Sequence, residues 1–368
     1  MQKVEESMKI LCCEKVEKYI EDEEDLIFDY NELKFYIYKE YVSEEKPAFD
    51  YSKYRECDRI LDIYIKKQKI GNITKKKLYS TVKSLLSSYK DREIDRGYFY
   101  YEKDAENDGA ESLVYKGVYM KTGQRVAIKM VKNDYLKNLK NLICLKREIN
   151  YLVTINHEFM QKFIGFSVSD CISGKMVWLI SEYISNRTLT IAKFNMNYFE
   201  LTKVAFQIAE VMEYLHSRRI IHRDLKPDNI MICNKSPILI DFGLSRNELG
   251  ADTITTEMGT YNYMAPEVFK NEYGRSVDVY SYAMILWELY SKIVPFAGKK
   301  MAVISNEISN GIRPEFDDNC PDGLRNLIIK GWSADPKSRP TFTEIIELMI
   351  KDKISFIPKN ETDKVLLD

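Results

Sequence analysis

The sequence predicts an α+β protein with a strand-rich lobe followed by a helix-rich lobe, both preceded by a mostly helical N-terminal region. Three observations support this prediction. Residues 1–93 contain one glycine and one proline and show no strand-like alternation. Short alternating segments begin near Tyr98. Beyond residue 200, long apolar stripes with helical spacing replace them.

Composition and charge indicate a folded protein without a strong attraction for nucleic acid. The 368 residues are 45% hydrophobic, and 55 basic side chains against 56 acidic ones leave a formal net charge of -1. A chain of this length can bury a sizeable core. Its near-zero charge gives no reason to expect a nucleic-acid partner.

The cysteines and the N-terminus predict a reducing compartment inside the cell. The seven cysteines are scattered apart from adjacent Cys12 and Cys13, and none forms a CxxC pair or a Cys/His ligand spacing. The N-terminus carries charges where a signal peptide requires an apolar core, and no apolar run approaches the roughly 18 residues of a membrane span. We expect a cytoplasmic protein, with the nucleus as the alternative.

Residues 1–93 are expected to form a helical extension whose role stays open. Two helical stripes stand out, one of Ile60, Ile63, Tyr64 and Lys67, the other of Leu78, Val82, Leu85, Leu86 and Tyr89, with Asn72 or Thr74 as the cap. The charged runs 21–25, 66–69 and 75–77 fit solvated helix faces better than partner-binding patches. The extension could bind a protein partner, inhibit the domain that follows, or be poorly ordered.

The first elements of the next lobe are a strand and a helix. Residues 125–130 alternate, which places Ala127 and Lys129 on one face of a strand. The following helix carries one stripe, formed by Leu142, Leu145, Glu148, Ile149 and Leu152. Because Glu148 lies among apolar residues, its carboxylate requires a lysine or arginine from a neighbouring element.

Two long helices are expected in the helix-rich lobe. Residues 201–215 form an amphipathic stripe that leads directly into His222. Residues 279–287 are apolar on nearly all sides, which is typical of a helix buried in a core.

The stretch from His222 to Asn229, with Asp241-Phe242-Gly243 after it, predicts a metal and proton-handling site. Residues 230–232 and 238–240 read as two short strands joined by the polar turn 234–237. Antiparallel strands bring their outer ends together, so Asn229 and Asp241 should lie side by side, a few residues from Asp224.

These residues resemble the protein kinase family, whose signature is an HRDLxxxN loop followed by DFG. The resemblance runs from about Tyr98 to about Lys351 and implies a bilobal kinase fold, with an antiparallel sheet and one key helix in the N-lobe and a helical C-lobe. It implies ATP and Mg²⁺ as cofactors and proteins as substrates. Asp224 would orient the acceptor hydroxyl and take its proton, Lys226 would neutralise the transferring phosphoryl group, and Asn229 and Asp241 would hold the metal.

The resemblance also implies an ATP-binding set in the first lobe. Lys129 would be the phosphate-binding lysine and Glu148 its partner. Ser181 would be the gatekeeper of the adenine pocket, and backbone groups near Glu182 and Ile184 would bind the adenine. The complete set expected at the nucleotide is Asn107, Gly109, Val114, Ala127, Lys129, Glu148, Ser181, Glu182, Ile184 and Met231.

The glycine-rich loop departs from the family pattern. Aligned on Val114, the pattern GxGxxGxV places Asn107 at its first glycine, Gly109 at its second and Ser112 at its third. Only the middle glycine is present. Asp108 and Glu111 put negative charge near a polyanion, which motivates the alternative that the chain is a pseudokinase or scaffold with weak nucleotide binding.

The segment from Gly259 to Glu267 resembles the end of a kinase activation segment. Lys226 with Thr260 is the serine/threonine-type pairing, dual specificity being the alternative, and the surrounding residues look most like the tyrosine kinase-like group. Because Arg223 precedes Asp224, Thr253, Thr255 and Thr256 are candidate regulatory phosphorylation sites.

Two further contacts and the domain limits follow from the resemblance. Glu267 with Arg339 would form a buried ion pair, and Asp278 would anchor the catalytic-loop backbone. The expected organisation is an extension over residues 1–93, a kinase domain over 94–352 and a short tail over 353–368. We predict an active serine/threonine kinase because Lys129, Glu148, Asp224, Asn229 and Asp241 are all present.

Overall fold

The computed structural model describes residues 75–102, 105–109, 111–169, 176–184, 187–242, 246–247, 261–270 and 274–360. These residues belong to two compact units. The strand-rich unit consists mainly of residues 75–149 and 163–183, and the helix-rich unit of residues 150–162 and those from 184 onward. The predicted α+β class, with an antiparallel sheet in one part and helices in the other, is confirmed.

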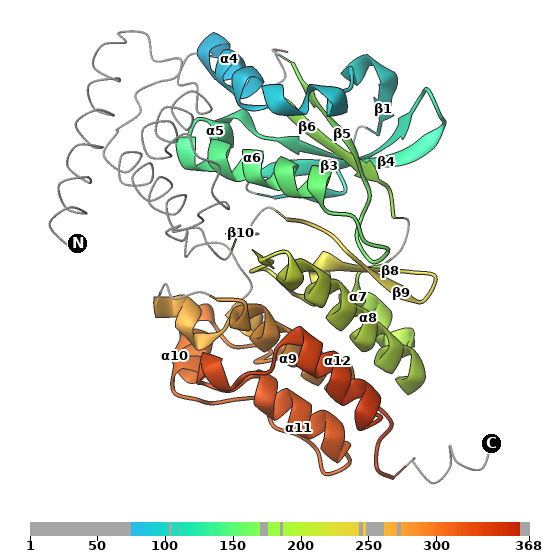
Figure 1. Cartoon of the computed structure of the whole chain (residues 1–368), viewed down its shortest axis with the longest axis vertical. Coiled ribbons are helices and arrows are strands. Elements are labelled where there is room, and N and C mark those ends of the chain that lie inside the picture. Colours follow the sequence, from blue (N-terminus) through green and yellow to red (C-terminus); the bar gives the residue numbers. More distant parts are fainter. Residues whose placement is uncertain are drawn as a thin grey trace, which may run out of the picture. The chain divides into compact units, whose positions relative to one another are not determined.

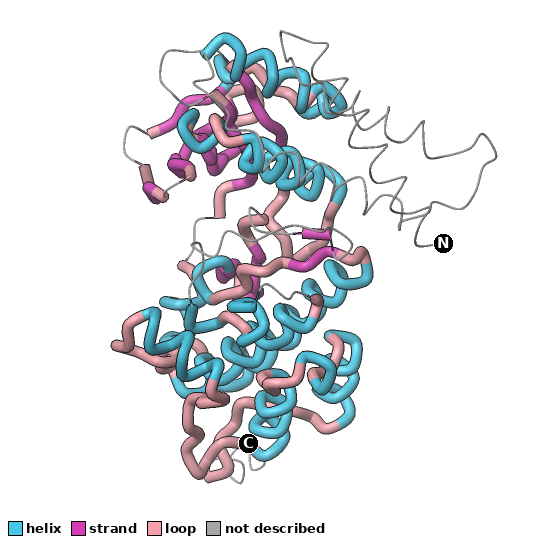
Figure 2. The backbone as a smooth tube through the Cα atoms, turned by 90° about the vertical axis from the view of Figure 1, so that its left-hand side faces the viewer, coloured by secondary structure: helices cyan, strands magenta, loops and turns pink. Residues whose placement is uncertain are grey.

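One antiparallel sheet organises the strand-rich unit (Figure 1). Its strands are β1 (Phe99–Tyr101), β2 (Asn107–Asp108), β3 (Ser112–Tyr119), β4 (Gln124–Val131), β5 (Phe163–Val168) and β6 (Val177–Glu182). Their order is β1-β3-β4-β6-β5, and β2 pairs with β3. Figure 2 shows these strands gathered together with helices of the same unit beside them.

Strand β4 forms as its alternation predicts. Val126 and Ile128 are fully buried, in a cluster whose other members are Phe99, Tyr115, Met130, Trp178 and Ile180. Ala127 and Lys129 alternate with them and are half-buried. One face of the sheet is therefore core, and the other is left for polar chemistry.

The helical elements of this unit are α4 (Lys75–Leu85), η1 (Ser87–Arg92), η2 (Arg96–Tyr98), α5 (Asn133–Leu136) and α6 (Leu139–Thr154), where η marks a 3-10 helix. Within α6, Leu142, Leu145 and Ile149 are buried, as their stripe predicts. The second predicted stripe is confirmed at Leu78, Val82 and Leu85 of α4 and at Leu86 directly after it, which are 0–7% exposed. Tyr89 was expected on the same helix, but α4 ends at Leu85 and Tyr89 lies in η1 with a non-helical φ of -117°.

The other predictions for the extension lie outside the described residues. This applies to the stripe from Ile60 to Lys67 and to the caps Asn72 and Thr74.

The segment after α4 adds to the edge of the sheet at β5. Glu93 forms a parallel bridge with Phe166, and the Ile94 amide donates to the Phe166 carbonyl over 2.7 Å. Lys83 of α4 forms an ion pair with Glu93. Gly165 permits this approach, because a Cβ there would lie 2.4 Å from the Arg92 carbonyl oxygen.

The helix-rich unit contains α7 (Leu189–Ala192), η3 (Lys193–Asn195), α8 (Tyr198–Ser217), β7 (Ile220–Ile221), η4 (Pro227–Asn229), β8 (Ile230–Cys233), β9 (Ser236–Leu239), β10 (Arg246–Asn247), η5 (Tyr261–Tyr263), η6 (Pro266–Lys270), α9 (Ser276–Ser291), α10 (Met301–Ser309), α11 (Asp322–Gly331), η7 (Pro336–Ser338) and α12 (Phe342–Lys351). The two long helices expected from the sequence are α8 and α9. Every residue from Val277 to Tyr290 of α9 is buried, which confirms a helix inside the core. Helix α8 begins at a capping box formed by Asn197 and Glu200.

The predicted hairpin after the catalytic loop is confirmed as β8 and β9. Cys233 pairs with Ser236, so the turn is shorter than expected and consists of Asn234 and Lys235. Both have positive φ, 49° and 62°, as a type I′ hairpin turn requires.

The predicted ion pair between Glu267 and Arg339 is confirmed. The guanidinium donates to both carboxylate oxygens, over 2.5 and 2.8 Å, and both side chains are buried. Arg339 also donates to the carbonyls of Ser276 and Ser333, so three segments meet at this cation.

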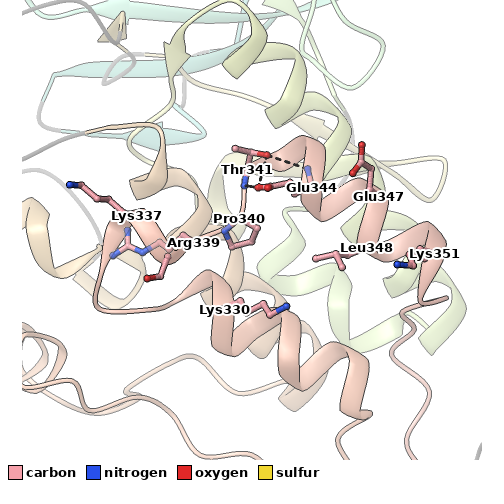
Figure 3. A pocket seen from close by; sticks show the side chains of 10 residues that line it. Lys330, Lys337, Arg339, Pro340, Thr341, Glu344, Glu347, Leu348 and Lys351 are labelled. Atoms are coloured by element: carbon pink, nitrogen blue, oxygen red, sulfur yellow. Dashed lines mark hydrogen bonds between the residues drawn. The ribbon is translucent and has the colours of Figure 1, made fainter.

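An open groove of about 640 Å³ lies beside Arg339 (Figure 3). It is lined by residues of α11, η7 and α12 and contains both charges, among them Lys330, Lys351 and Glu347. None of the site residues predicted from the sequence lines it, so it has no part in the site below.

Candidate active site

Four of the predicted nucleotide-binding residues share one face of the sheet. Val114 of β3 pairs with Lys129 of β4, and Ala127 of β4 pairs with Ser181 of β6. Paired residues on neighbouring strands point to the same side, and residues two apart on one strand do too. Val114, Lys129, Ala127 and Ser181 therefore form one patch opposite the buried Val126 and Ile128.

Lys129 and Glu148 form the ion pair that the apolar surroundings of Glu148 require. The Lys129 ammonium donates to a carboxylate oxygen of Glu148 over 2.8 Å, and Glu148 is 8% exposed. The pair holds a cation at a fixed place on the sheet face. A fixed ammonium suits the binding of phosphate oxygens.

Two further predicted nucleotide-binding residues, Glu182 and Ile184, follow Ser181 along the chain, and Ile184 is already part of the helix-rich unit. Glu182 is the last residue of β6 and pairs with Val126. Tyr183, which follows it, donates its amide to the Arg125 carbonyl over 3.2 Å, so the backbone is held until the segment leaves the sheet before Ile184. Met231, which is also in the helix-rich unit, lies on β8 and forms an isolated antiparallel β-bridge with Thr188.

The eroded glycine-rich loop is a closed hairpin turn. Asn107 pairs with Val114, and the Gly109 amide donates to the Ser112 carbonyl over 3.0 Å. Its two acids, Asp108 and Glu111, both interact with side chains of the segment that follows β4. Lys132 forms an ion pair with Asp108 over 2.8 Å and donates to the Gly109 carbonyl over 2.7 Å.

The second loop acid, Glu111, meets Tyr135. Burial, the charge of Glu111 and a hydrogen bond between the two side chains hold the pKa of the Tyr135 hydroxyl above its ordinary value. The Lys132 amide also donates to the Glu111 carbonyl over 2.9 Å. Sequence reasoning missed Lys132 and Tyr135, and the available signal was their position directly after the Val-Ala-Ile-Lys strand.

The catalytic loop brings Asp224, Lys226 and Asn229 into one cluster. Lys226 donates to both Asp224 carboxylate oxygens, over 2.8 and 3.1 Å. The Asn229 amide nitrogen donates to Asp224 twice, over 2.8 Å to the carboxylate and over 2.8 Å to the backbone carbonyl. These contacts orient the Asp224 carboxylate and place a positive charge beside it.

Asp278 anchors this loop, as expected. Its carboxylate accepts the amides of His222 and Arg223, each over 2.8 Å, and also contacts His216 over 2.8 Å. Burial alone would raise the pKa of Asp278, but His216, His222 and the Arg223 amide hold that pKa below its ordinary value. The anchor is therefore an ionised carboxylate inside the core.

His222 itself is a structural member of the loop. It is 1% exposed, its ring packs edge-on against Phe242 at 5.5 Å, and its Nδ1 accepts the Asp224 amide over 3.3 Å. Burial lowers the pKa of His222 despite the nearby acids Asp278, Asp224 and Asp241. The ring is thus neutral near pH 7.

The donor set at Asn229 and Asp241 fits a magnesium ion. The Ile240 amide donates to the Asn229 carbonyl over 2.9 Å, which places Asp241 beside Asn229 as the hairpin geometry predicts. Both protons of the Asn229 amide nitrogen point to Asp224, so its side-chain oxygen is the atom left to meet a cation. One carboxylate and one amide oxygen, completed by substrate phosphates, is a typical magnesium environment in phosphotransferases.

Several predicted site residues lie outside the described residues. These are Thr260 and the candidate phosphorylation sites Thr253, Thr255 and Thr256. For Asn107 the structure describes the backbone alone. Their roles stay predictions.

Comparison with known proteins gives a consistent result. Residues 107–349 match the family described as the protein kinase domain. The serine/threonine/tyrosine-protein kinase HT1 of Arabidopsis thaliana is 32% identical over 256 residues, covering 66% of this chain and 64% of that protein. The serine/threonine-protein kinase VIK of Arabidopsis thaliana is 35% identical over 246 residues, covering 63% and 55%.

A third relative is the probable serine/threonine-protein kinase drkD of Dictyostelium discoideum, 33% identical over 266 residues. The alignment covers 70% of this chain and 20% of drkD. The chain thus spans less than two thirds of the length of each of these relatives. In the described part of the chain, no helix has both the length and the apolar character needed to cross a membrane.

Proposed function

Because the chain belongs to the protein kinase family, we propose that it transfers the γ-phosphoryl group of ATP to serine or threonine hydroxyls of protein substrates. The observation that carries this proposal is the cluster of Asp224, Lys226 and Asn229, held by hydrogen bonds of 2.8 to 3.1 Å. Phosphoryl transfer depends on positioned charge more than on a covalent nucleophile, and this cluster positions charge.

Each group has a role that its surroundings support. Asp224 orients the acceptor hydroxyl and accepts its proton, which moves late in the reaction. Lys226 offsets negative charge on the transferring group, and Lys129 binds phosphate oxygens. Asn229 and Asp241 would hold Mg²⁺, which when bound would neutralise negative charge on the phosphates.

The pseudokinase alternative is not favoured. Its motivation is the negative charge of Asp108 and Glu111 in the eroded loop. Asp108 forms an ion pair with Lys132, and Glu111 forms a hydrogen bond with Tyr135. The catalytic positions Lys129, Asp224 and Asp241 are all present.

Serine/threonine preference is proposed over dual specificity. It rests on Lys226 and on the predicted pairing with Thr260. Dual specificity stays the alternative, because the name of the relative HT1 includes tyrosine. A cytoplasmic or nuclear location, a protein partner for the N-terminal extension and regulation through Thr253, Thr255 or Thr256 stay predictions.

The proposal is tested by phosphate transfer from Mg²⁺-ATP to a generic protein substrate, using the full chain. We expect Asp224→Asn and Asp241→Asn each to lower the rate by about 10² to 10⁴, because each removes a charge acting in the transition state. Asp134→Asn, at an exposed acid paired with Lys137, is the matched control and should leave the rate unchanged.

Phosphoamino-acid analysis of the product identifies the acceptor. Phosphoserine and phosphothreonine are expected, and phosphotyrosine would show dual specificity. Equal signal from wild type, Asp224→Asn and Asp241→Asn would refute the kinase proposal.

A further inference from the structure

The eroded glycine-rich loop lacks two glycines and carries two acids at variable positions of the pattern. Two of the three expected glycines are replaced, by Asn107 and Ser112, and Asp108 and Glu111 stand between them. This loop covers the ATP phosphates in protein kinases. A carboxylate within about one Debye length, ~8 Å at physiological salt, repels a polyanion unless a cation offsets it.

Lys132 is that cation for Asp108. Its ammonium forms an ion pair with the Asp108 carboxylate over 2.8 Å and donates to the Gly109 carbonyl over 2.7 Å. One side chain therefore neutralises the loop acid and holds the turn at the single remaining glycine. The contact joins the end of β4, three residues after Lys129, to the tip of the hairpin.

This ion pair contributes little to folding. The side chains of Lys132 and Asp108 are 34% and 69% exposed, and such exposed pairs add little stability. The hairpin is held separately by the pairing of β2 with β3 and by the hydrogen bond from the Lys132 amide to the Glu111 carbonyl. Replacing the Lys132 side chain removes neither of these backbone contacts.

We propose that Lys132 is a positioning residue for the nucleotide and acts through Asp108. It offsets the negative charge of the loop and fixes the tip of the hairpin. The loop can therefore bind ATP phosphates even though two of its glycines are absent. This inference rests on the proposed kinase function. It assigns to Lys132 an effect on phosphate binding and none on adenine binding or on the chemical step.

A double-mutant cycle tests the proposal. In Lys132→Met, Asp108 is left without its cation, and we expect KM for ATP and Kd for ADP to rise about three- to fivefold at low salt, with kcat unchanged. Asp108→Asn removes the acid and should lower both constants. In the Asp108→Asn background, Lys132→Met should have a smaller effect, because only the hydrogen bond to the Gly109 carbonyl is then lost.

Three controls separate this role from a general effect on the structure. Lys137→Met removes a similar exposed pair, with Asp134, and should change neither constant. Lys132→Arg should restore the wild-type values, because it keeps the charge. The Kd for adenosine, which has no phosphate, should be the same in wild type and Lys132→Met.

The outcomes are distinct. Unchanged ADP binding in Lys132→Met would overturn the proposal. An equal loss in the wild-type and Asp108→Asn backgrounds would also overturn it, because it would mean that Lys132 does not act through Asp108. Because ADP binding is measured without catalysis, the result stands even if the wild type transfers no phosphate, an outcome that would refute the kinase proposal alone.

Discussion

At the scale of single residues, Ser181 combines burial with small size. It is 9% exposed, lies on β6 and pairs with Ala127, on the sheet face that also carries Lys129. A small side chain at the gatekeeper position leaves room beside the adenine, and a larger one would fill that room. The size of the side chain at residue 181 should therefore affect which nucleotides the protein can use.

We predict that wild type uses ATP analogues enlarged at N6 and that Ser181→Phe does not, because the phenyl ring occupies the space the enlargement requires. The measurement is the kcat/KM of both proteins for ATP and for the analogue. Ser181→Phe should retain use of ATP, which controls for folding. If both proteins use the analogue equally poorly, Ser181 is not the gatekeeper.

The residues of the candidate site differ in how far the sequence could predict them. Glu148 was predictable, because a carboxylate in an apolar stripe requires a cation, and Lys129 meets it at 2.8 Å. The contact of Lys132 with Asp108 was not predictable, because a single lysine in the short segment between a predicted strand and a predicted helix belongs to no periodic pattern. Its partner is selected by the hairpin, which only the folded chain defines.

At the scale of elements, α4 and the segment up to Ile94 pack onto the strand-rich unit. Four side chains of the α4 segment are 0–7% exposed, and the Ile94 amide donates to Phe166 of β5. The family match begins at residue 107, so this packing lies outside it. We propose that residues 75–98 stabilise the strand-rich unit.

We predict that Gly165→Ala destabilises the protein by about 1 to 3 kcal/mol, as overpacking in a tight core does. The new methyl group would lie 2.4 Å from the Arg92 carbonyl oxygen and 2.8 Å from Ile94 Cδ1, so the segment must move away. Thermal unfolding and limited proteolysis at residues 86–98 measure the effect. Gly274→Ala, whose nearest atom lies at 3.8 Å, is the control. Equal melting temperatures for the two variants would contradict this packing.

Long elements were predictable and short ones were not. The stripes of α8 and α9 span several turns, so their period is clear in the sequence. The two-residue strands β2, β7 and β10 are too short to show alternation and exist because of their partners. The docking of Glu93 and Ile94 on β5 joins segments about 70 residues apart, which local patterns do not encode.

At the scale of the whole molecule, stability should depend on pH through His157, which is half-buried, and His222, which is buried. Burial lowers the pKa of both His157 and His222 below the ordinary value of 6.5. The unfolded chain therefore binds protons at a higher pH than the folded chain does, and acid favours unfolding. The stabilising effect is complete above pH 6.5 and is lost progressively as the pH falls below it.

We predict that the free energy of unfolding, measured by urea titration, falls as the pH is lowered from about 7.5 to about 5. His157→Asn should reduce the change of the free energy of unfolding with pH, because it removes one of the two histidines, and it leaves the catalytic loop unchanged. Asp278, whose pKa is lowered below 3.8, loses its stabilising contribution only at a more acidic pH, outside the range of this titration. A free energy of unfolding that is constant over the tested range would contradict the prediction.

The hydrogen bonds from Asn229 to Asp224 also bear on the entropy of ligand binding. The Asn229 amide nitrogen donates to the Asp224 carboxylate and to its backbone carbonyl, over 2.8 Å each, and these bonds restrain both side chains. Ordering a free side chain on binding costs about 0.5 to 1.5 kcal/mol. Because Asp278 also holds the backbone of this loop, a metal-nucleotide complex should meet a loop with little disorder left to lose.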